Sequence, residues 1–200
     1  MSELETEVIP LINEMSLGST QIIPVAQTLL ARWASKTVMM YGQYRPETNG
    51  FTSAAYRIVY ETQQPPTGMD IHLGWCSQAM TVLWTDGLRI GAHGTPIESI
   101  LSSEPALASG FVGLEGLCLF VNWVSPEIDL PLNARSQLSG AALDSSRKIH
   151  RIWPTSTTLA WPPKEMSERQ VRRAMGSQSR AVQRLLTLSP EVITSSENQG

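Results

Sequence analysis

The chain is short of charge, of cysteine and of long apolar runs. Charged residues make up only 16% of its 200 residues, whereas about a quarter is usual in soluble domains. Its 2 cysteines, Cys76 and Cys118, are too few for a disulfide framework, and both lie in apolar runs typical of buried free thiols. No run approaches the roughly 20 apolar residues of a transmembrane helix, and the N-terminal region lacks the basic and apolar segments of a signal peptide. We therefore expect a reducing, cytosolic environment and no membrane partner.

Residues that carry out catalysis are also scarce. Only 3 histidines could serve as imidazole bases, and no G-x-S-x-G nucleophile elbow occurs. His72 and Cys76 alone do not supply the three or four converging ligands of a metal site. The glycine-rich stretch 91–96 lacks the lysine of a phosphate-binding loop, and the carboxylates Glu127 and Asp129 are typical of a solvated loop. We predict a protein that is not an enzyme, with no metal, no cofactor and no small-molecule substrate.

Short segments rich in β-branched and aromatic residues dominate residues 37–161. Those that we expect to be strands are TVMMYGQYR, FTSAAYRIVYE, MDIHLGW, AMTVLW, LRIGAH, GLCLFVNWV and TSTTLAW. The pairs Asn49-Gly50 and Asp86-Gly87 are typical of hairpin turns. Seven or eight short strands indicate an all-β sandwich, with a jelly roll among the candidates.

Three segments lie outside this pattern or interrupt it. Residues 1–24 are acidic and turn-rich, and we expect an arm outside the core. PVAQTLLARWASK repeats apolar residues at helical spacing behind Pro24, which predicts a short helix. The Pro- and Ser-punctuated stretch 125–146 predicts a long connection of the kind that is often functional.

Charge is divided unevenly along the chain. Residues 1–146 carry 6 Lys/Arg against 14 Asp/Glu, whereas residues 147–184 carry 9 against 2. Within the basic region, SERQVRRAMGSQSRAVQRLL predicts an amphipathic helix that begins with an S-x-x-Q capping box and weakens at Gly176. Its aliphatic residues gather opposite a face made of Arg169, Arg172, Arg173, Arg180 and Arg184.

This arginine face has several interpretations, which the sequence leaves open. Arginines neutralise phosphates, so RNA contact is reasonable, and a basic amphipathic helix can also lie on an anionic membrane surface. The aliphatic side could instead dock on a neighbouring subunit or on its own domain. Trp153 and Trp161, which flank the last expected strand, are either core residues or anchors of a subunit interface, where tryptophan is enriched.

An acidic arm, a short helix, a run of strands without catalytic residues and a charged tail follow one another along the chain. This order resembles the capsid (coat) proteins of picorna-like icosahedral plant viruses, specifically the secovirids such as the cheraviruses. TLLARW is similar to the helix that often precedes the first strands of such subunits, and FTSAAYRIVYE is similar to the strand that follows. IWPTSTTLAWPP occupies the place of the last strand.

The resemblance implies an eight-stranded jelly-roll β-sandwich over residues 25–163, with a short N-terminal helix. Residues 1–24 would be an N-terminal arm and residues 164–200 a C-terminal basic helix and tail. It further implies a structural subunit of an icosahedral viral capsid, which assembles with copies or sibling coat proteins around an RNA genome, in the virion and the host cytoplasm.

Two alternatives stay open beside the capsid interpretation. One is a carbohydrate- or peptide-binding β-sandwich module that uses the 125–146 loop as its contact. The other is an RNA-binding or silencing-suppressor protein that uses residues 147–184.

Overall fold

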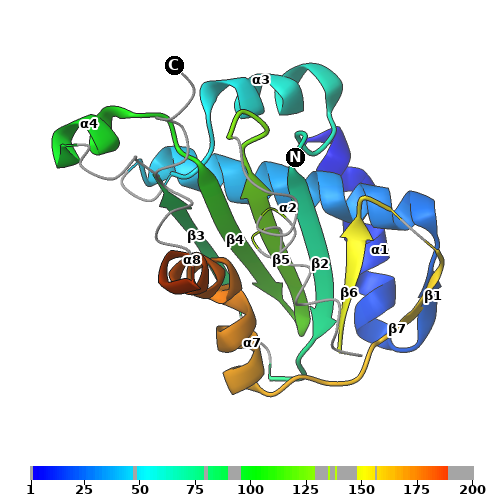
Figure 1. Ribbon diagram of the computed structural model, residues 1–200. Helices are drawn as coiled ribbons and strands as arrows, with labels where there is room; N and C mark the ends of the chain where they lie inside the picture. The colour runs from blue at the N-terminus through cyan, green and yellow to red at the C-terminus, as the bar shows by residue number, and fades with distance from the viewer. Residues whose placement is uncertain are drawn as a thin grey trace.

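The computed structural model describes residues 2–46, 49–78, 81–89, 96–128, 135, 138, 148–155 and 157–188. Its main sheet is antiparallel, with the strand order β3-β4-β5-β2-β6. The strands are β2 (Met69–Trp75), β3 (Val82–Leu88), β4 (Leu107–Leu114), β5 (Leu117–Val124) and β6 (Ile149–Trp153). Helix α2 (Pro24–Tyr44) crosses one face of the sheet, and α7 (Glu168–Met175) and α8 (Ser177–Leu188) lie on the other (Figure 1). The described residues therefore form helix, sheet and helix layers.

The predicted all-β jelly roll is wrong. A jelly roll packs two sheets against each other, whereas helices cover both faces of the main sheet here. In the part of the chain that the structure describes, the second sheet is a small pair of β1 (Thr20–Ile22) with β7 (Leu159–Trp161). The sequence misled because β5 is buried at every position. A strand that is buried on both faces is apolar throughout, whether helices or another sheet cover it.

Helix α2 includes a segment that we expected to be a strand, TVMMYGQYR. The helix begins with Pro24 at its first turn, a position that suits proline because no backbone donor is lost. Its buried stripe continues from Leu30 through Val38 to Gly42 at spacings of three and four residues. That spacing keeps one side of a helix on the sheet over the whole length, and it outweighs the β-branched and aromatic content of the segment.

A second expected strand, FTSAAYRIVYE, forms helix α3 (Ser53–Thr62). The hydroxyl of Thr52 caps this helix by accepting a hydrogen bond from the Ala55 backbone N–H over 3.2 Å. The Tyr56 hydroxyl then donates to the Met39 carbonyl oxygen over 2.9 Å, which fixes α3 against α2. Tyr56, Ile58 and Tyr60 alternate with other residues as in a half-buried strand, but this alternation was coincidental, because Tyr60 is 83% exposed.

The N-terminal segment is part of the core and not an arm outside it. Helix α1 (Glu3–Leu17) packs against α2 and buries Leu4, Val8, Ile12 and Met15 on one side. These positions recur every three or four residues, as an amphipathic helix requires. The short helix α4 (Ile97–Ser102) lies between β3 and β4.

The main sheet divides the apolar core between its two faces. On β4 and β5, side chains such as Ala108, Leu119 and Val121 pack toward the α2 layer. Phe111 and Phe120 point the other way, toward α7, with ring centroids 5.2 Å apart. Sequence reasoning missed β4 altogether, because its segment LASGFVGL is rich in small residues.

Neither Asn49-Gly50 nor Asp86-Gly87 forms the expected hairpin turn. Gly50 belongs to the α2–α3 connection and Gly87 to β3. Both glycines allow these backbones to touch, because a Cβ built on Gly50 would lie 2.6 Å from the Gly87 Cα. The tight hairpin turn is Glu115-Gly116, between β4 and β5, where φ is 48° and 87°. Two consecutive positive φ values are typical of a type I′ turn.

Two other segments that we singled out lie mostly outside the described residues. Of the 125–146 connection, the structure describes 125–128, Arg135 and Leu138, and Leu138 is buried. Of the expected strand LRIGAH, it describes Leu88 and Arg89.

Candidate functional site

The C-terminal basic region begins as the sequence predicts and folds onto its own domain. The Ser167 backbone N–H donates to Gln170 Oε1 over 3.0 Å, which completes the predicted capping box. The helix breaks at Gly176, between α7 and α8. Val171 and Ala174 of α7 are buried against the second apolar cluster, which also contains Phe111, Phe120, Cys76, Cys118, Ile149 and Met166. The aliphatic side of α7 is therefore covered by the protein's own sheet, while the Leu185 and Leu186 side chains lie outside the described side chains.

A buried polar side chain locks α8 to the sheet. Gln178 is only 2% exposed, and its Oε1 accepts a hydrogen bond from the Ser109 hydroxyl of β4 over 2.7 Å. Its Nε2 donates to the carbonyl oxygens of Trp123 and Leu138, each over 3.1 Å. Because a buried amide is costly unless it is hydrogen-bonded, this arrangement favours one register of α8 on the sheet.

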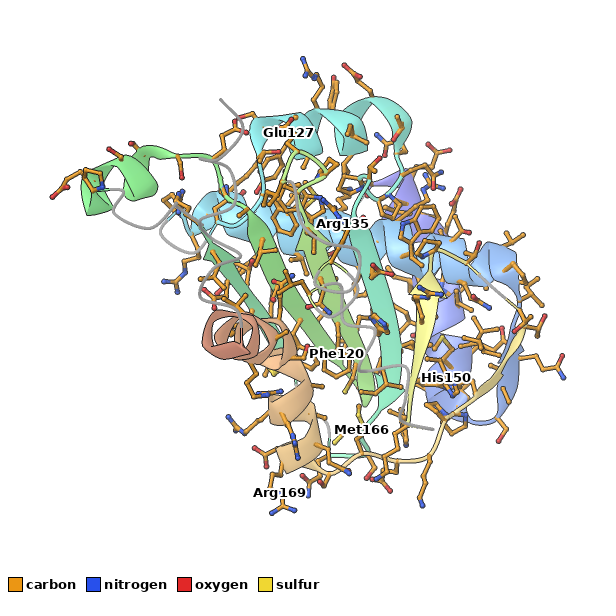
Figure 2. The ribbon with its side chains drawn as sticks, in the orientation of Figure 1. Phe120, Glu127, Arg135, His150, Met166 and Arg169 are labelled. Atoms are coloured by element: carbon orange, nitrogen blue, oxygen red, sulfur yellow. The ribbon has the colours of Figure 1, made fainter. Side chains whose placement is uncertain are left out.

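The arginine face lies on the opposite side of α7, toward solvent. Arg169, Arg172 and Arg173 are exposed, and Figure 2 shows Arg169 pointing away from the sheet. Arg172 pairs with Glu168 over 2.5 Å, but both side chains are largely exposed, so the pair contributes at most about 1 kcal/mol. The fold therefore does not depend on these arginines for its packing.

The other two predicted arginines differ from this group. Arg180 is half-buried, and its guanidinium donates to the Arg173 carbonyl oxygen. The side chain of Arg184 lies outside the described side chains. Lys164 is exposed just before α7, and Lys148 Nζ donates to Gln170 Oε1 over 2.9 Å. The described basic surface thus gathers lysines and arginines around α7; we call it the α7 basic face and define it by Lys148, Lys164, Arg169, Arg172 and Arg173.

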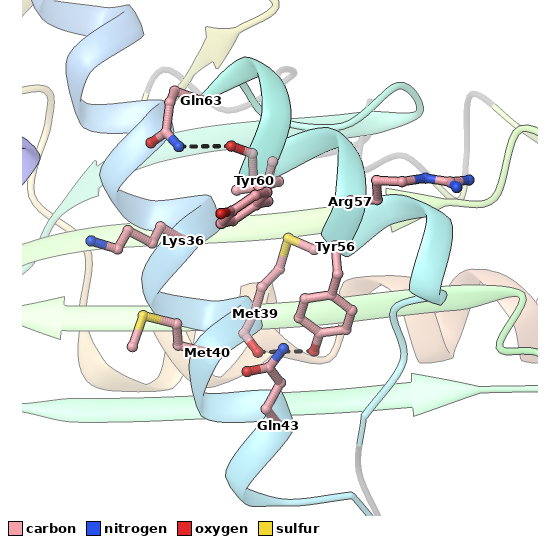
Figure 3. Close-up of a pocket in the computed structure, with 9 residues that line it drawn as sticks. Lys36, Met39, Met40, Gln43, Tyr56, Arg57, Tyr60 and Gln63 are labelled. Atoms are coloured by element: carbon pink, nitrogen blue, oxygen red, sulfur yellow. Dashed lines mark hydrogen bonds between the residues drawn. The ribbon is translucent and has the colours of Figure 1, made fainter.

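A groove lies between α2 and α3, in a region that sequence reasoning assigned to strands (Figure 3). Its volume is about 460 Å³, and it is lined by Lys36, Met39, Met40 and Gln43 from α2 and by Tyr56, Arg57, Val59, Tyr60 and Gln63 from α3 and its cap. Apolar side chains supply most of its surface. The described lining residues include two cations and no carboxylate.

Large apolar side chains remain exposed beside this groove and along the same layer. They are Ile9, Leu17, Ile23, Val25, Met40, Tyr44 and Tyr60. Among the described residues, every exposed large apolar side chain belongs to this N-terminal part, within or next to α1, α2 and α3. Exposed apolar surface concentrated on one layer is typical of a protein–protein interface.

The two candidate interface tryptophans belong to the region around β6 and β7. Trp161 is 3% exposed; its Nε1 donates to the Met15 carbonyl oxygen over 2.9 Å, and its ring stands edge-on to Trp75. Trp153 is half-buried against the apolar cluster that contains Trp161. Trp161 is therefore a core residue that holds β7 to α1 within one chain. Part of the Trp153 side chain remains accessible to solvent.

The residues that we considered for catalysis are dispersed. His72, Cys76 and Cys118 are buried around the sheet, while His93 and Asp129 lie outside the described residues. Burial raises the pKa of the Cys118 thiol to about 12, with a smaller contribution from Cys76. At neutral pH this thiol is protonated, which disfavours it as a nucleophile. In the described ranges, no group of three or more His, Cys, Asp or Glu residues could hold a metal ion.

Comparison with known proteins finds no matching family model, no matching curated protein and no matching solved structure. Among the helices that the structure describes, none combines the length and the apolar character that crossing a membrane would require.

Proposed function

We propose that this protein is a structural subunit of a virus particle, which assembles with copies of itself and holds an RNA genome. The observation that carries the proposal is the separation of two chemically different surfaces. The apolar groove and its exposed neighbours belong to the α1–α3 layer, and the α7 basic face belongs to the layer across the sheet. A subunit of a particle needs both kinds of surface, one for other subunits and one for the nucleic acid.

The α1–α3 layer supports assembly through protein contacts. Tyr60 and Met40, which are 83% and 46% exposed, both line the groove, and apolar surface gathered in this way marks protein interfaces. Aromatic residues and methionine are enriched in the centres of protein interfaces, and charge is depleted there. The low content of charged residues in the whole chain, 16%, also favours protein contacts.

The α7 basic face supports contact with RNA. The core does not use the side chains of Arg169, Arg172 and Arg173, because the opposite side of α7 makes the packing contacts. Three exposed arginines on one helix, with Lys148 and Lys164 beside it, can neutralise several phosphates and release the ions that surround them. Glu168, which pairs with Arg172, reduces this charge only in part.

The viral setting comes from the sequence resemblance to coat proteins and from no feature of the fold. Since the jelly roll is absent, the arrangement of subunits in a particle does not follow from that resemblance. The second candidate function is an RNA-binding protein that does not assemble, because it would use the same α7 basic face. The two differ in whether protein contacts form alongside RNA contacts.

Nuclease protection distinguishes these functions. The purified chain is mixed with single-stranded RNA at physiological salt, treated with ribonuclease, and the surviving RNA lengths are measured. A structural subunit is expected to protect RNA far longer than one molecule covers, in a complex that sediments faster as protein is added. Protection limited to short fragments would favour the non-assembling RNA-binding protein, and no protection at any ratio would contradict RNA as the cargo.

A further inference from the structure

We propose that copies of the chain join through two different patches: the acidic stripe of α1 from one copy docks in the α2–α3 groove of the next. We define the acidic stripe by Glu3, Glu7, Pro10, Glu14 and Leu17. This inference rests on the proposed assembly function and names the surfaces that carry it. It involves residues that the sequence analysis did not assign to any interface.

The groove has the chemistry of a site for an acidic, partly apolar helix. Met40, Val59 and Tyr60 supply apolar surface, and Tyr60 is 83% exposed at the rim. Lys36 and Arg57 place positive charge along the same surface. Lys36 Nζ donates to Ser2 Oγ over 2.9 Å, so its position is fixed, whereas the Arg57 side chain is exposed.

The acidic stripe has the complementary chemistry. Its members are spaced by three or four residues along α1, which places all of them on one side of the helix. All of them are exposed, and Leu17 is 89% exposed. The side that packs on α2 is a different one, formed by Leu4, Val8, Ile12 and Met15. The stripe therefore presents an exposed leucine next to several negative charges, which suits a groove that combines apolar surface with positive charge.

The two patches also match in length. Glu7 and Glu14 are seven residues apart, as are Lys36 and Gln43, and seven helical residues span about 10 Å. A helix can therefore lie along the groove with one carboxylate near Lys36, the other near the Gln43 amide, and Leu17 toward the exposed Tyr44 at the end of α2. Because complementary charge adds specificity as well as encounter rate, the two patches would select each other over other apolar surfaces.

Contacts between two unlike patches have a consequence for assembly. Every copy carries one stripe and one groove, so each bound copy still presents a free patch at either end. Such heterologous contacts build rings when the rotation closes and open chains when it does not. This is the type of contact from which a particle larger than a dimer can grow.

Sedimentation velocity of the full chain over a concentration series tests the inference with two variants. One variant, Glu7→Lys with Glu14→Lys, reverses the stripe, and the other, Arg57→Gln with Tyr60→Ser, removes a cation and the exposed ring from the groove. The matched control, Glu104→Lys with Glu115→Lys, makes the same charge change as the stripe variant at exposed sites outside both patches. Circular dichroism melting confirms that each variant folds.

Each variant alone is expected to weaken self-association at least about tenfold, a change of ~1.4 kcal/mol in association free energy, while the control associates like the original chain. An equal mixture of the two variants is expected to form pairs and to stop there. The intact stripe of the groove variant still fits the intact groove of the stripe variant, and no second such contact is available.

The outcomes separate this inference from the proposed function. If the original chain associates but both variants associate equally well, the inference is overturned and the assembly function stands. Folded variants that fail to pair when mixed would overturn it as well. If the original chain stays monomeric at every concentration, with and without RNA, both the inference and the assembly function are overturned.

Discussion

Gln178 on α8 and Ser109 on β4 share a buried hydrogen bond of 2.7 Å, which links residues 69 positions apart in the sequence. The same Gln178 amide also binds the backbone of Trp123 and Leu138. The C-terminal basic region is thus integrated into the fold through α8, while the arginines of α7 remain at the surface.

Replacing Gln178 with alanine is expected to destabilise the protein by about 1–3 kcal/mol, because two carbonyl oxygens and the Ser109 hydroxyl lose their partner in a buried layer. Urea unfolding measures the change. Gln43→Ala, at an exposed glutamine of α2, is the matched control and is expected to leave the unfolding midpoint nearly unchanged. Equal midpoints for the two variants would contradict the anchoring role of Gln178.

Gly110→Ala is expected to destabilise the protein by about 1–3 kcal/mol through overpacking, because the added Cβ would lie 2.1 Å from Val38 Cγ1. Combining it with Val38→Ala removes the clashing methyl groups. The double variant should then be more stable than the sum of the two single effects predicts, which equilibrium unfolding can measure. Strict additivity would show that α2 does not approach β4 as closely as the structure has it.

Stability is expected to fall at alkaline pH. Burial raises the pKa of Cys118 from 9.0 to about 12, so the folded state keeps a proton that the unfolded chain releases. The stabilisation is complete below about pH 9 and is lost as pH rises toward about 12, by at most ~1.4 kcal/mol per pH unit. Burial also raises the pKa of Tyr56 to about 12, so this hydroxyl likewise makes the folded state less stable as the pH rises.

Unfolding free energies measured between pH 8 and pH 11 test this dependence. Cys118→Ala should reduce the slope above pH 9, and Tyr56→Phe should reduce it above pH 10, whatever each substitution does to stability at neutral pH. An unchanged slope in both variants would contradict the assignment of these two groups.

Replacing Arg169 and Arg173 with glutamine is expected to weaken RNA binding and to flatten its salt dependence, by about one unit of slope for each lost phosphate contact. Fluorescence anisotropy with a labelled single-stranded RNA over a salt series gives the slope. Arg45→Gln with Arg151→Gln, which removes two exposed arginines outside both the α7 basic face and the groove, is the matched control and should keep the original slope. If the control and the double variant flatten the slope equally, the α7 basic face is not the RNA site.

Local signals in the sequence predicted the C-terminal region and the central strands. The Ser167–Gln170 capping box and the break at Gly176 depend on neighbours within a few residues, and both predictions were confirmed. The segments MDIHLGW and GLCLFVNWV form β2 and β5, as their β-branched and aromatic residues between turn signals predicted. In each case the determining interactions are short-range.

The helical layer depended on long-range packing and was predicted wrongly. Residues 38–44 and 53–62 have β-branched and aromatic content, but α2 buries its stripe on the sheet and α3 is held to α2 by the Tyr56 hydroxyl. The α2–α3 groove was missed for the same reason, since its two sides meet only after α3 folds back. The four-residue spacing of Leu30, Ala34, Val38 and Gly42 was the signal that could have revealed the helix α2.

The most direct test of the central claim, a structural subunit that assembles around RNA, is negative-stain electron microscopy of the purified chain mixed with single-stranded RNA at physiological salt. The proposed function predicts closed or extended particles of repeating subunits. The stripe–groove inference adds that these particles disappear in the stripe and groove variants and persist in the Glu104→Lys, Glu115→Lys control. A field of isolated monomers, from a chain that is folded and binds RNA, would contradict it.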